Sequence, residues 1–253
     1  MPRPRDVFPS PCLLYGLAVF VLDYLADETV LEQTIREIAI WALPVLVAII
    51  FHEVAHGWVA YRLGDPTAAR MGRLTLNPIA HIDLFGTILI PLLLIVSQSP
   101  FLFGYAKPVP VNFYNLRNPK RDMIWVALAG PVTNLLLALG CILVLKVMLP
   151  LSSAAAAHSG GAAWFDFFAP ISLMARNGVL INVVLAVFNA FPIPPLDGGR
   201  VMVGLLPEPQ SSMLAKVEPY GFLIVIVLLM TRTLNHVIGP PMDLLLNFYF
   251  GLL

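Results

Sequence analysis

The segment His52-Glu53-x-x-His56 has the residue types and spacing of a metal-assisted hydrolytic site. Residues i and i+4 of a helix lie on one face, one turn apart, so two imidazoles there can bind one zinc ion from a single rigid element. Glu53 lies beside them, where its carboxylate can act as general base toward the attacking water. A chance match, or hydrogen bonding in a helix core, is the alternative. The motif lies within the apolar run 38–63, and ionisable groups inside a membrane helix are costly and normally functional, so the pattern favours a zinc site.

A catalytic zinc ion takes three protein ligands, and this motif supplies two. The candidates for the third are His81, His158, His236 and Asp197. Asp197 follows prolines that break a helix and precedes two glycines that permit unusual backbone angles, so it is presented on a kinked, extended segment. An Asp at this position could instead cap a short helix. Beside an unfinished zinc site, the ligand role is the favoured interpretation.

Taken together, these motifs resemble the site-2 protease family of intramembrane metalloproteases, also called the M50 peptidases. The resemblance rests on His52-Glu53-x-x-His56 in an early apolar run and on Asn189-x-x-Pro192-x-x-Pro195-Leu196-Asp197-Gly198 after a later one. Two further elements are similar to the family, Gly130-Pro131-Val-Thr-Asn134 and Ala106-Lys107-Pro108-Val109-Pro110-Val111-Asn112. The second resembles the compact bacterial branch, without a PDZ domain. The resemblance covers about 38–203.

The resemblance implies a role for each residue of the site. His52, His56 and Asp197 would hold one zinc ion, and Glu53 would be the catalytic base. Asn189 would be catalytic by positioning the substrate or donating to the oxyanion, for which an amide is suited. Its alternative role is a hydrogen bond between helices, which polar residues in membrane bundles often make.

Three other polar residues are expected to be structural. Asn134 and Asn182 are predicted to make hydrogen bonds between membrane helices. His81 follows the zinc motif closely, but its spacing does not suit ligation, so a structural role is favoured for it.

The composition is that of an integral membrane protein. Of 253 residues, 58% are hydrophobic and 12% are charged, with a mean hydropathy of +0.83, whereas a soluble domain carries about 25% charged residues. A helix crosses a bilayer with roughly 20 mainly apolar residues. The sequence therefore predicts one all-α polytopic membrane domain, residues 1–253, with about six transmembrane helices. Apolar runs that reach or approach the required length lie at 12–26, 38–63, 84–103, 123–149, 171–191 and 220–231.

The two ends of the chain are interpreted separately. The run 12–26 contains Asp23 and shows no small-x-small cleavage site, so it is interpreted as a retained anchor or interfacial helix rather than a signal peptide. The last apolar stretch, 242–253, is short and is expected to lie along the membrane surface. The net charge of +0 gives no sign of nucleic-acid binding.

Basic residues mark cytoplasmic loops and so predict the topology. The run 84–103 has Arg73 before it and Lys107 and Lys120 after it, so a simple pass would place one basic loop outside. The run, which carries Pro91 in its middle, is therefore predicted to be a re-entrant insertion; a single pass with a basic outer loop is the alternative. The active site should then open toward the cytoplasm from a bacterial inner membrane.

The predicted function is hydrolysis of peptide bonds within the transmembrane segments of membrane-protein substrates, in contact with lipid. Such a substrate helix must unwind locally because its amides are locked in hydrogen bonds. An extended protein segment could hold the unwound strand by edge pairing, and the candidates are 72–76 and 107–112. The alternatives are a zinc transporter or sensor and a non-catalytic pseudoprotease. One compact metal set with a glutamate placed as base argues against both.

Overall fold

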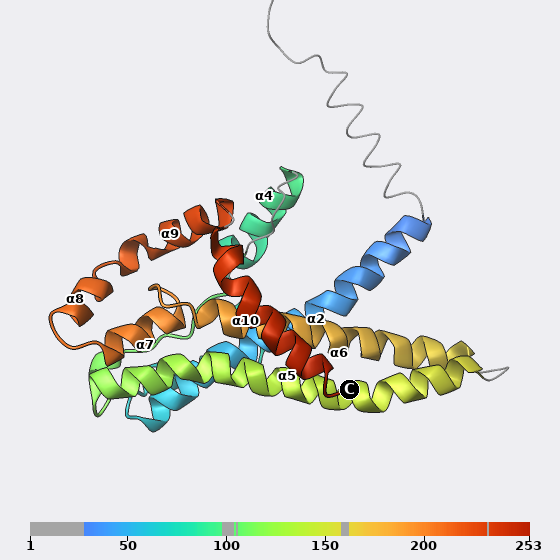
Figure 1. Cartoon of the computed structure of the whole chain (residues 1–253), viewed down its shortest axis with the longest axis horizontal. Helices are drawn as coiled ribbons and strands as arrows, with labels where there is room; N and C mark the ends of the chain where they lie inside the picture. The colour runs from blue at the N-terminus through green and yellow to red at the C-terminus, as the bar shows by residue number, and fades with distance from the viewer. Residues whose placement is uncertain (1–27, 98–103, 105, 158–161, 232) are drawn as a thin grey trace, which may run out of the picture. The chain divides into compact units, whose positions relative to one another are not determined.

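The computed structural model describes residues 28–97, 104, 106–157, 162–231 and 233–253 (Figure 1). Its regular elements are all helices, and none of the described residues forms a strand. The chain divides into two units between Ala42 and Leu43, within helix α2 (Glu28–Arg62). All of the sites below lie in the second unit, Leu43–Leu253.

Three helices are long and apolar enough to cross a membrane. They contain the candidate spans Ile35–Arg62 in α2, Pro119–Ala157, which is α5, and Trp164–Asn189 in α6 (Ala162–Asn189). Their mean hydropathies are 2.2, 2.4 and 1.8. These spans confirm that the protein is an all-α integral membrane protein.

The expected number of about six spans is not confirmed, because three of the predicted runs give full-length candidates. The runs that begin at 84 and 220 form the shorter apolar helices Leu84–Leu94 and Glu218–Leu228. Eleven residues of helix rise only about 16 Å, against a hydrocarbon core of about 30 Å. The run 12–26 lies outside the described residues, and so does the end of the predicted re-entrant run, at 98–103.

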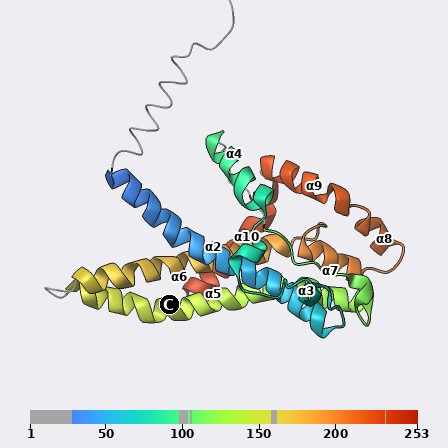
Figure 2. The same cartoon turned by 180° about the vertical axis from the view of Figure 1, so that it is seen from behind.

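Helices α5 and α6 pack side by side along their lengths and form the core of the second unit (Figures 1 and 2). Ala138 and Ile142 of α5 are buried against Val179 and Val183 of α6. Van der Waals packing of this kind drives helix association in membranes.

The last helix, α10 (Thr233–Phe250), packs on both α5 and α6. Its Tyr249 is buried in the same core, where the hydroxyl donates to the carbonyl of Leu135 at 2.8 Å. The C-terminal apolar stretch is therefore anchored on the core at this residue.

Short helices connect the long ones. Between α2 and α5 lie α3 (Thr67–Arg70), the 3-10 helix η1 (Pro78–His81), the π-helix η2 (Leu84–Leu89), α4 (Ile90–Val96) and the 3-10 helix η3 (Phe113–Asn115). After α6 follow α7 (Asp197–Leu205), α8 (Gln210–Ala215) and α9 (Glu218–Met230).

Asp65 ties the end of α2 to the chain that leads into α5. It is fully buried and accepts hydrogen bonds from the Asn112 amide at 2.7 Å and the Asn115 side chain at 2.9 Å, and from the amide and hydroxyl of Thr67. Burial raises the pKa of this carboxyl, but the hydrogen bonds from Thr67, Asn115 and Asn112 outweigh burial, and the pKa is lowered overall.

Arg73 holds the segment 106–112 against the turn that contains η1. Its guanidinium donates to the carbonyl of Ala80 and to those of Lys107 and Pro108, at 2.8 and 3.2 Å. The amide of Lys107 donates to the carbonyl of His81 at 2.9 Å. The two segments that were candidates for edge pairing thus meet here, although neither forms a strand.

Candidate metal centre and active site

The site is built from α2, α7 and one face of α5. The helix periodicity of α2 places His52 and His56 on one face, one turn apart. Asp197 is the first residue of α7, after a turn that begins at the end of α6. Gly198 and Gly199 keep this turn tight, because a Cβ on either would lie 2.1 Å from backbone atoms of Ala190 or Pro194.

The two imidazoles and the carboxylate converge. The Nε2 atoms of His52 and His56 lie 3.0 Å apart, and Oδ2 of Asp197 lies 3.2 Å from each. His52 and Asp197 are buried, and the side chain of His56 is 12% exposed. All three residues that the sequence analysis favoured as ligands are therefore together. These three residues, called the metal cluster below, could hold one metal ion.

Hydrogen bonds on the far side of each ring fix which nitrogens face the cluster. Nδ1 of His56 lies 2.7 Å from the carbonyl oxygen of Val126, which can only accept. Nδ1 of His52 lies 2.6 Å from Oδ1 of Asn134. The side-chain N–H groups of Asn134 donate to Ala48 and Asn182 instead, so its oxygen is the acceptor for His52. Both Nδ1 atoms therefore carry the hydrogen of the neutral ring, and both Nε2 atoms present lone pairs to the cluster.

This donor set fits a cation. The buried Oδ2 of Asp197 has no hydrogen-bond partner among the described residues, so three electron-rich atoms face one another at 3.0–3.2 Å. Ligand atoms at about 2.0–2.1 Å from a tetrahedral zinc ion lie roughly 3.3 Å from one another. The spacing therefore matches three corners of a zinc tetrahedron.

Helix α5 makes room for this cluster through Gly130. A Cβ at this position would lie 2.4 Å from Nε2 of His56 and 2.6 Å from Nε2 of His52. Glycine thus allows the α5 backbone to pass directly beside the two rings.

Asn134 and Asn182 make the predicted hydrogen bonds between helices. Both are buried, and the Asn134 amide donates to Oδ1 of Asn182 at 2.7 Å and to the carbonyl of Ala48 at 3.1 Å. Asn134 also orients His52, which the sequence reasoning missed. Its partner is 82 positions away, so the motif Gly130-Pro131-x-x-Asn134 was the one signal that could have drawn attention to it.

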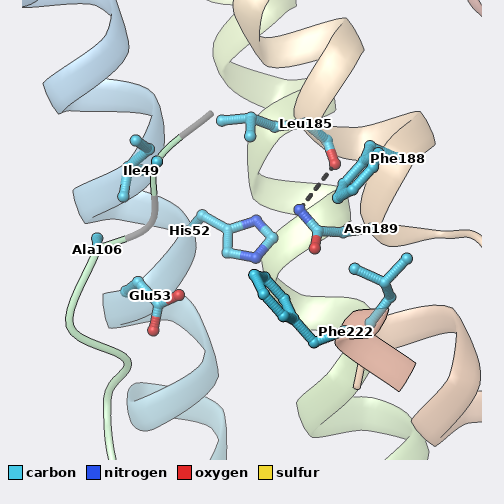
Figure 3. A pocket seen from close by; sticks show the side chains of 10 residues that line it. Ile49, His52, Glu53, Ala106, Leu185, Phe188, Asn189 and Phe222 are labelled. Carbon is cyan, nitrogen blue, oxygen red and sulfur yellow. Dashed lines mark hydrogen bonds between the residues drawn. The ribbon is translucent and has the colours of Figure 1, made fainter. Parts of the chain in front are cut away.

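Glu53 lies beside the metal cluster at the wall of a cavity of about 490 Å³ (Figure 3). Its Oε2 accepts the amide hydrogen of Val109 at 2.8 Å. Prolines stand on both sides of Val109, so this amide is the one backbone donor that the triplet 108–110 offers. The rest of the lining is mainly apolar and includes Ile49, Leu185, Phe188, Leu196 and Phe222.

Asn189 lies across the cavity from His52 (Figure 3). Its side-chain amide donates to the carbonyl of Leu185, one turn earlier in α6, at 3.0 Å. This hydrogen bond is thus within helix α6 rather than between helices.

The remaining histidines considered as ligands do not join the cluster among the described residues. His81 is buried in η1, where its Nε2 lies 2.8 Å from the carbonyl of Thr75. His236 lies in α10, and His158 lies outside the described residues.

Comparison with known proteins agrees with this site. Residues 40–232 match peptidase family M50. This chain belongs to peptidase family M50. At its C-terminal end the match extends beyond the range 38–203 in which the sequence motifs lie, and it takes in the end of α7, all of α8 and all of α9.

Curated relatives of this M50 peptidase cover most of its length. YwhC of Bacillus subtilis, provisionally named a zinc metalloprotease, is 38% identical over 203 residues, which are 79% of this chain and 84% of YwhC. Rip2 of Mycolicibacterium smegmatis, named in the same way, is 30% identical over 247 residues, 93% of this chain and 85% of Rip2. Rip2 of Mycobacterium tuberculosis is 30% identical over 243 residues, 91% and 84% of the two chains. No solved structure matches the chain.

Proposed function

We propose that this M50 peptidase cuts peptide bonds within or next to the transmembrane segments of other membrane proteins, as in regulated intramembrane proteolysis. Its class, a zinc metallopeptidase, follows from the family and the metal cluster. The observation that supports the intramembrane site is the position of His52, Glu53 and His56 inside the candidate span Ile35–Arg62. A scissile bond must come to these residues to be cut.

His52, His56 and Asp197 are proposed to hold the zinc ion. When bound there, zinc would polarise the scissile carbonyl and lower the pKa of water. The Nδ1 hydrogen bonds to Asn134 and Val126 keep both rings in the tautomer that leaves Nε2 for the metal.

Glu53 is proposed to move the proton. Its Oε2 is fixed by the amide of Val109, which leaves Oε1 to take a proton from the attacking water and to return it to the leaving amine. Because the carboxylate is held on one side only, it keeps its orientation while one oxygen changes protonation state.

Asn189 is proposed as a donor to the substrate. One N–H of its amide bonds to Leu185, and an amide has a second N–H that remains for a substrate carbonyl or oxyanion. Its place across the cavity from His52 supports this role.

The proposed substrate is a membrane helix that opens near the cut. A helix already lies at the depth of Glu53 and has only to expose about one turn, whereas a soluble unfolded peptide would carry many unsatisfied amides there, at several kcal/mol each. The apolar walls of the cavity, among them Phe188 and Phe222, suit side chains of a membrane segment. We place the enzyme in a bacterial inner membrane, with this cavity opening toward the cytoplasm.

The test is metal-dependent cleavage of a reporter membrane helix by the purified full chain in lipid vesicles. The zinc-loaded enzyme should cut within the span, and Glu53→Gln should keep zinc but lose cleavage, because an amide cannot accept the proton. His56→Ala should lose both. A Glu53→Gln variant that cuts at the wild-type rate would contradict the mechanism, and zinc flux without cleavage would indicate a transporter.

A further inference from the structure

A second apolar cavity lies between α5, α6 and α10, where α10 packs on the other two helices (Figure 1). Its volume is about 530 Å³. All of the residues that line it are apolar, and they come from α5, from α10 and from the end of α6 with the turn that follows. This cavity is called the α10 groove below.

The α10 groove opens to the outer surface of the helices. Val132 of α5 and Val237 of α10 are in its walls, and they are 48% and 51% exposed. Val132 belongs to the candidate span Pro119–Ala157. The medium outside the groove is therefore the hydrocarbon of the membrane, and the groove continues the surface that meets lipid.

The groove and the metal cluster use the same turns of α5. Gly130 and Asn134 face the histidine rings, and the residue that follows each of them, Pro131 or Leu135, lines the groove. Consecutive residues of a helix are about 100° apart around its axis and 1.5 Å apart along it. The groove therefore lies at the depth of the metal cluster, on a different face of α5.

A smaller cavity of about 130 Å³ adjoins the groove and reaches Asp197. It shares four lining residues with the groove, among them Ala190 and Pro192, and Asp197 is in its wall. Ala190 and Pro192 lie on the turn between α6 and α7, and a Cβ on Gly198 would lie 2.1 Å from the carbonyl oxygen of Ala190. Whatever fills the groove therefore packs on the turn that positions Asp197.

The groove suits a hydrocarbon chain better than water or a helix. A buried water needs roughly two to four polar partners, and the side chains that line the groove offer none. A helix about 10 Å across fills roughly 420 Å³ per turn, so the groove would hold little more than one turn of a partner helix. An acyl chain is apolar, is one methylene wide and is present at this depth of a membrane.

We propose that the α10 groove binds an acyl chain of a membrane phospholipid, and that this chain supports the turn that positions Asp197. The chain supplies van der Waals contacts to the walls that an empty groove would lack. The described residues that line the groove are all different from those that line the active-site cavity. The lipid thus acts on the metal cluster without competing with a substrate.

The first test is crosslinking of the full chain in vesicles of phosphatidylcholine that carries a diazirine in the middle of one acyl chain. Adducts, located by mass spectrometry, should concentrate on the groove walls of α5 and α10. Val132→Trp and Val237→Trp place an indole ring in the groove from two different walls, and each should lower these adducts at least fivefold.

Leu136→Trp and Leu244→Trp are the matched controls. Leu136 and Leu244 lie on the same two helices and are 63% and 71% exposed, but neither lines the groove. Both controls should keep the wild-type adducts. Adducts spread evenly over all exposed apolar positions, or lowered equally in the controls, would show only the lipid that surrounds any membrane protein and would overturn the site.

The second test is zinc affinity after the bound lipid is washed away with detergent. Wild type should bind zinc about tenfold more weakly, as expected when a metal ligand loses its support, and should recover when phosphatidylcholine is added back. Val132→Trp should keep its affinity without lipid, because the indole ring fills the groove. An unchanged wild-type affinity would overturn the support of Asp197. Neither test measures cleavage, so both outcomes are independent of the proposed function.

Discussion

At the residue scale, the two imidazoles that we propose as zinc ligands depend on partners from a different helix. Val126 and Asn134 of α5 take the Nδ1 hydrogens of His56 and His52 and so leave both Nε2 atoms for the metal. The Val126 partner is a backbone carbonyl that no substitution removes. The Asn134 partner is a side chain, so its contribution can be measured.

Replacement of Asn134 by Leu should weaken zinc binding by about 10- to 100-fold, the usual effect of removing the group that orients a metal-binding histidine. His52 would lose its acceptor and could take the other tautomer. Competition with a chromophoric chelator gives the affinity. The control is Ser172→Ala, which removes a buried hydrogen bond between α5 and α6 that involves Ser152 rather than the metal cluster. Equal losses in both variants would assign the effect to general destabilisation.

Gly130→Ala should abolish zinc binding, whereas the same change at Gly140 of the same helix should be tolerated. The new methyl group would lie 2.4 Å from Nε2 of His56, so the rings would have to leave their positions. Gly140→Ala is the matched control, because a Cβ there meets no atom within 4 Å, and Ala favours a helix by about 1 kcal/mol over Gly. Zinc content and the melting temperature in detergent distinguish the two. A Gly130→Ala variant with full zinc content would contradict this packing.

Much of the site could be predicted from the sequence because the evidence for it is local. The i, i+4 spacing of His52 and His56 and the Pro- and Gly-rich turn around Asp197 are readable without a structure. The contacts of Asn134 with His52 and of Val109 with Glu53 were not predictable in this way. They join residues 82 and 56 positions apart, and depend on which helix faces pack together.

At the element scale, hydropathy predicted the three long helices, whereas the apolar runs that begin at 84 and 220 form shorter helices. The run beginning at 84 starts as the π-helix η2, which Asp83 caps through the amides of Phe85 and Gly86, and changes to α4 at Ile90, next to Pro91. An apolar composition gives no information on such breaks. The segment 106–112, which contacts the proposed base Glu53, likewise forms no long element, and the polar side chains of Arg73 and Asp65 hold it in place.

Asp65 accepts four of the hydrogen bonds in these polar connections, and it should make stability depend on pH in the acid range. Because the pKa of Asp65 is lowered on folding, its charged form stabilises the fold at pH values above the unfolded pKa of about 4. That stabilisation is lost as the pH falls through the lower, folded pKa. Asp65→Asn should therefore lower the melting temperature at pH 7, and the difference from wild type should shrink below about pH 4.

The melting temperature of Asp65→Asn is measured against pH in detergent, beside the exposed Asp166→Asn as control. The control should follow the wild type throughout. A constant difference for Asp65→Asn from pH 7 to pH 3 would mean that its charge has no role in the connection.

At the scale of the second unit, hydrogen bonds join the end of α2 to the beginning of α5. The amide of Arg117 donates to the carbonyl of Leu63 at 3.1 Å, and Asp65 binds Asn112 and Asn115. These two ends must therefore lie at the same side of a membrane. The basic residues Arg62, Arg70, Arg73, Arg117, Lys120 and Arg121 are all in these two connected regions.

This connection predicts that the chain between them, 84–103, enters the membrane and returns on the side from which it came. The basic residues further predict that this side is the cytoplasm.

Arg73 is buried and donates hydrogen bonds to three carbonyls, so the exposed Met71 is the better site for a probe. Single cysteines at Met71 and Lys120, in a chain with Cys12 and Cys141 replaced by Ser, should both react with an impermeant maleimide in inside-out vesicles. Neither should react in intact cells stripped of the outer membrane. Labelling of the two positions from opposite faces would require a complete pass by 84–103, and would break the hydrogen bonds that place α2 and α5 together.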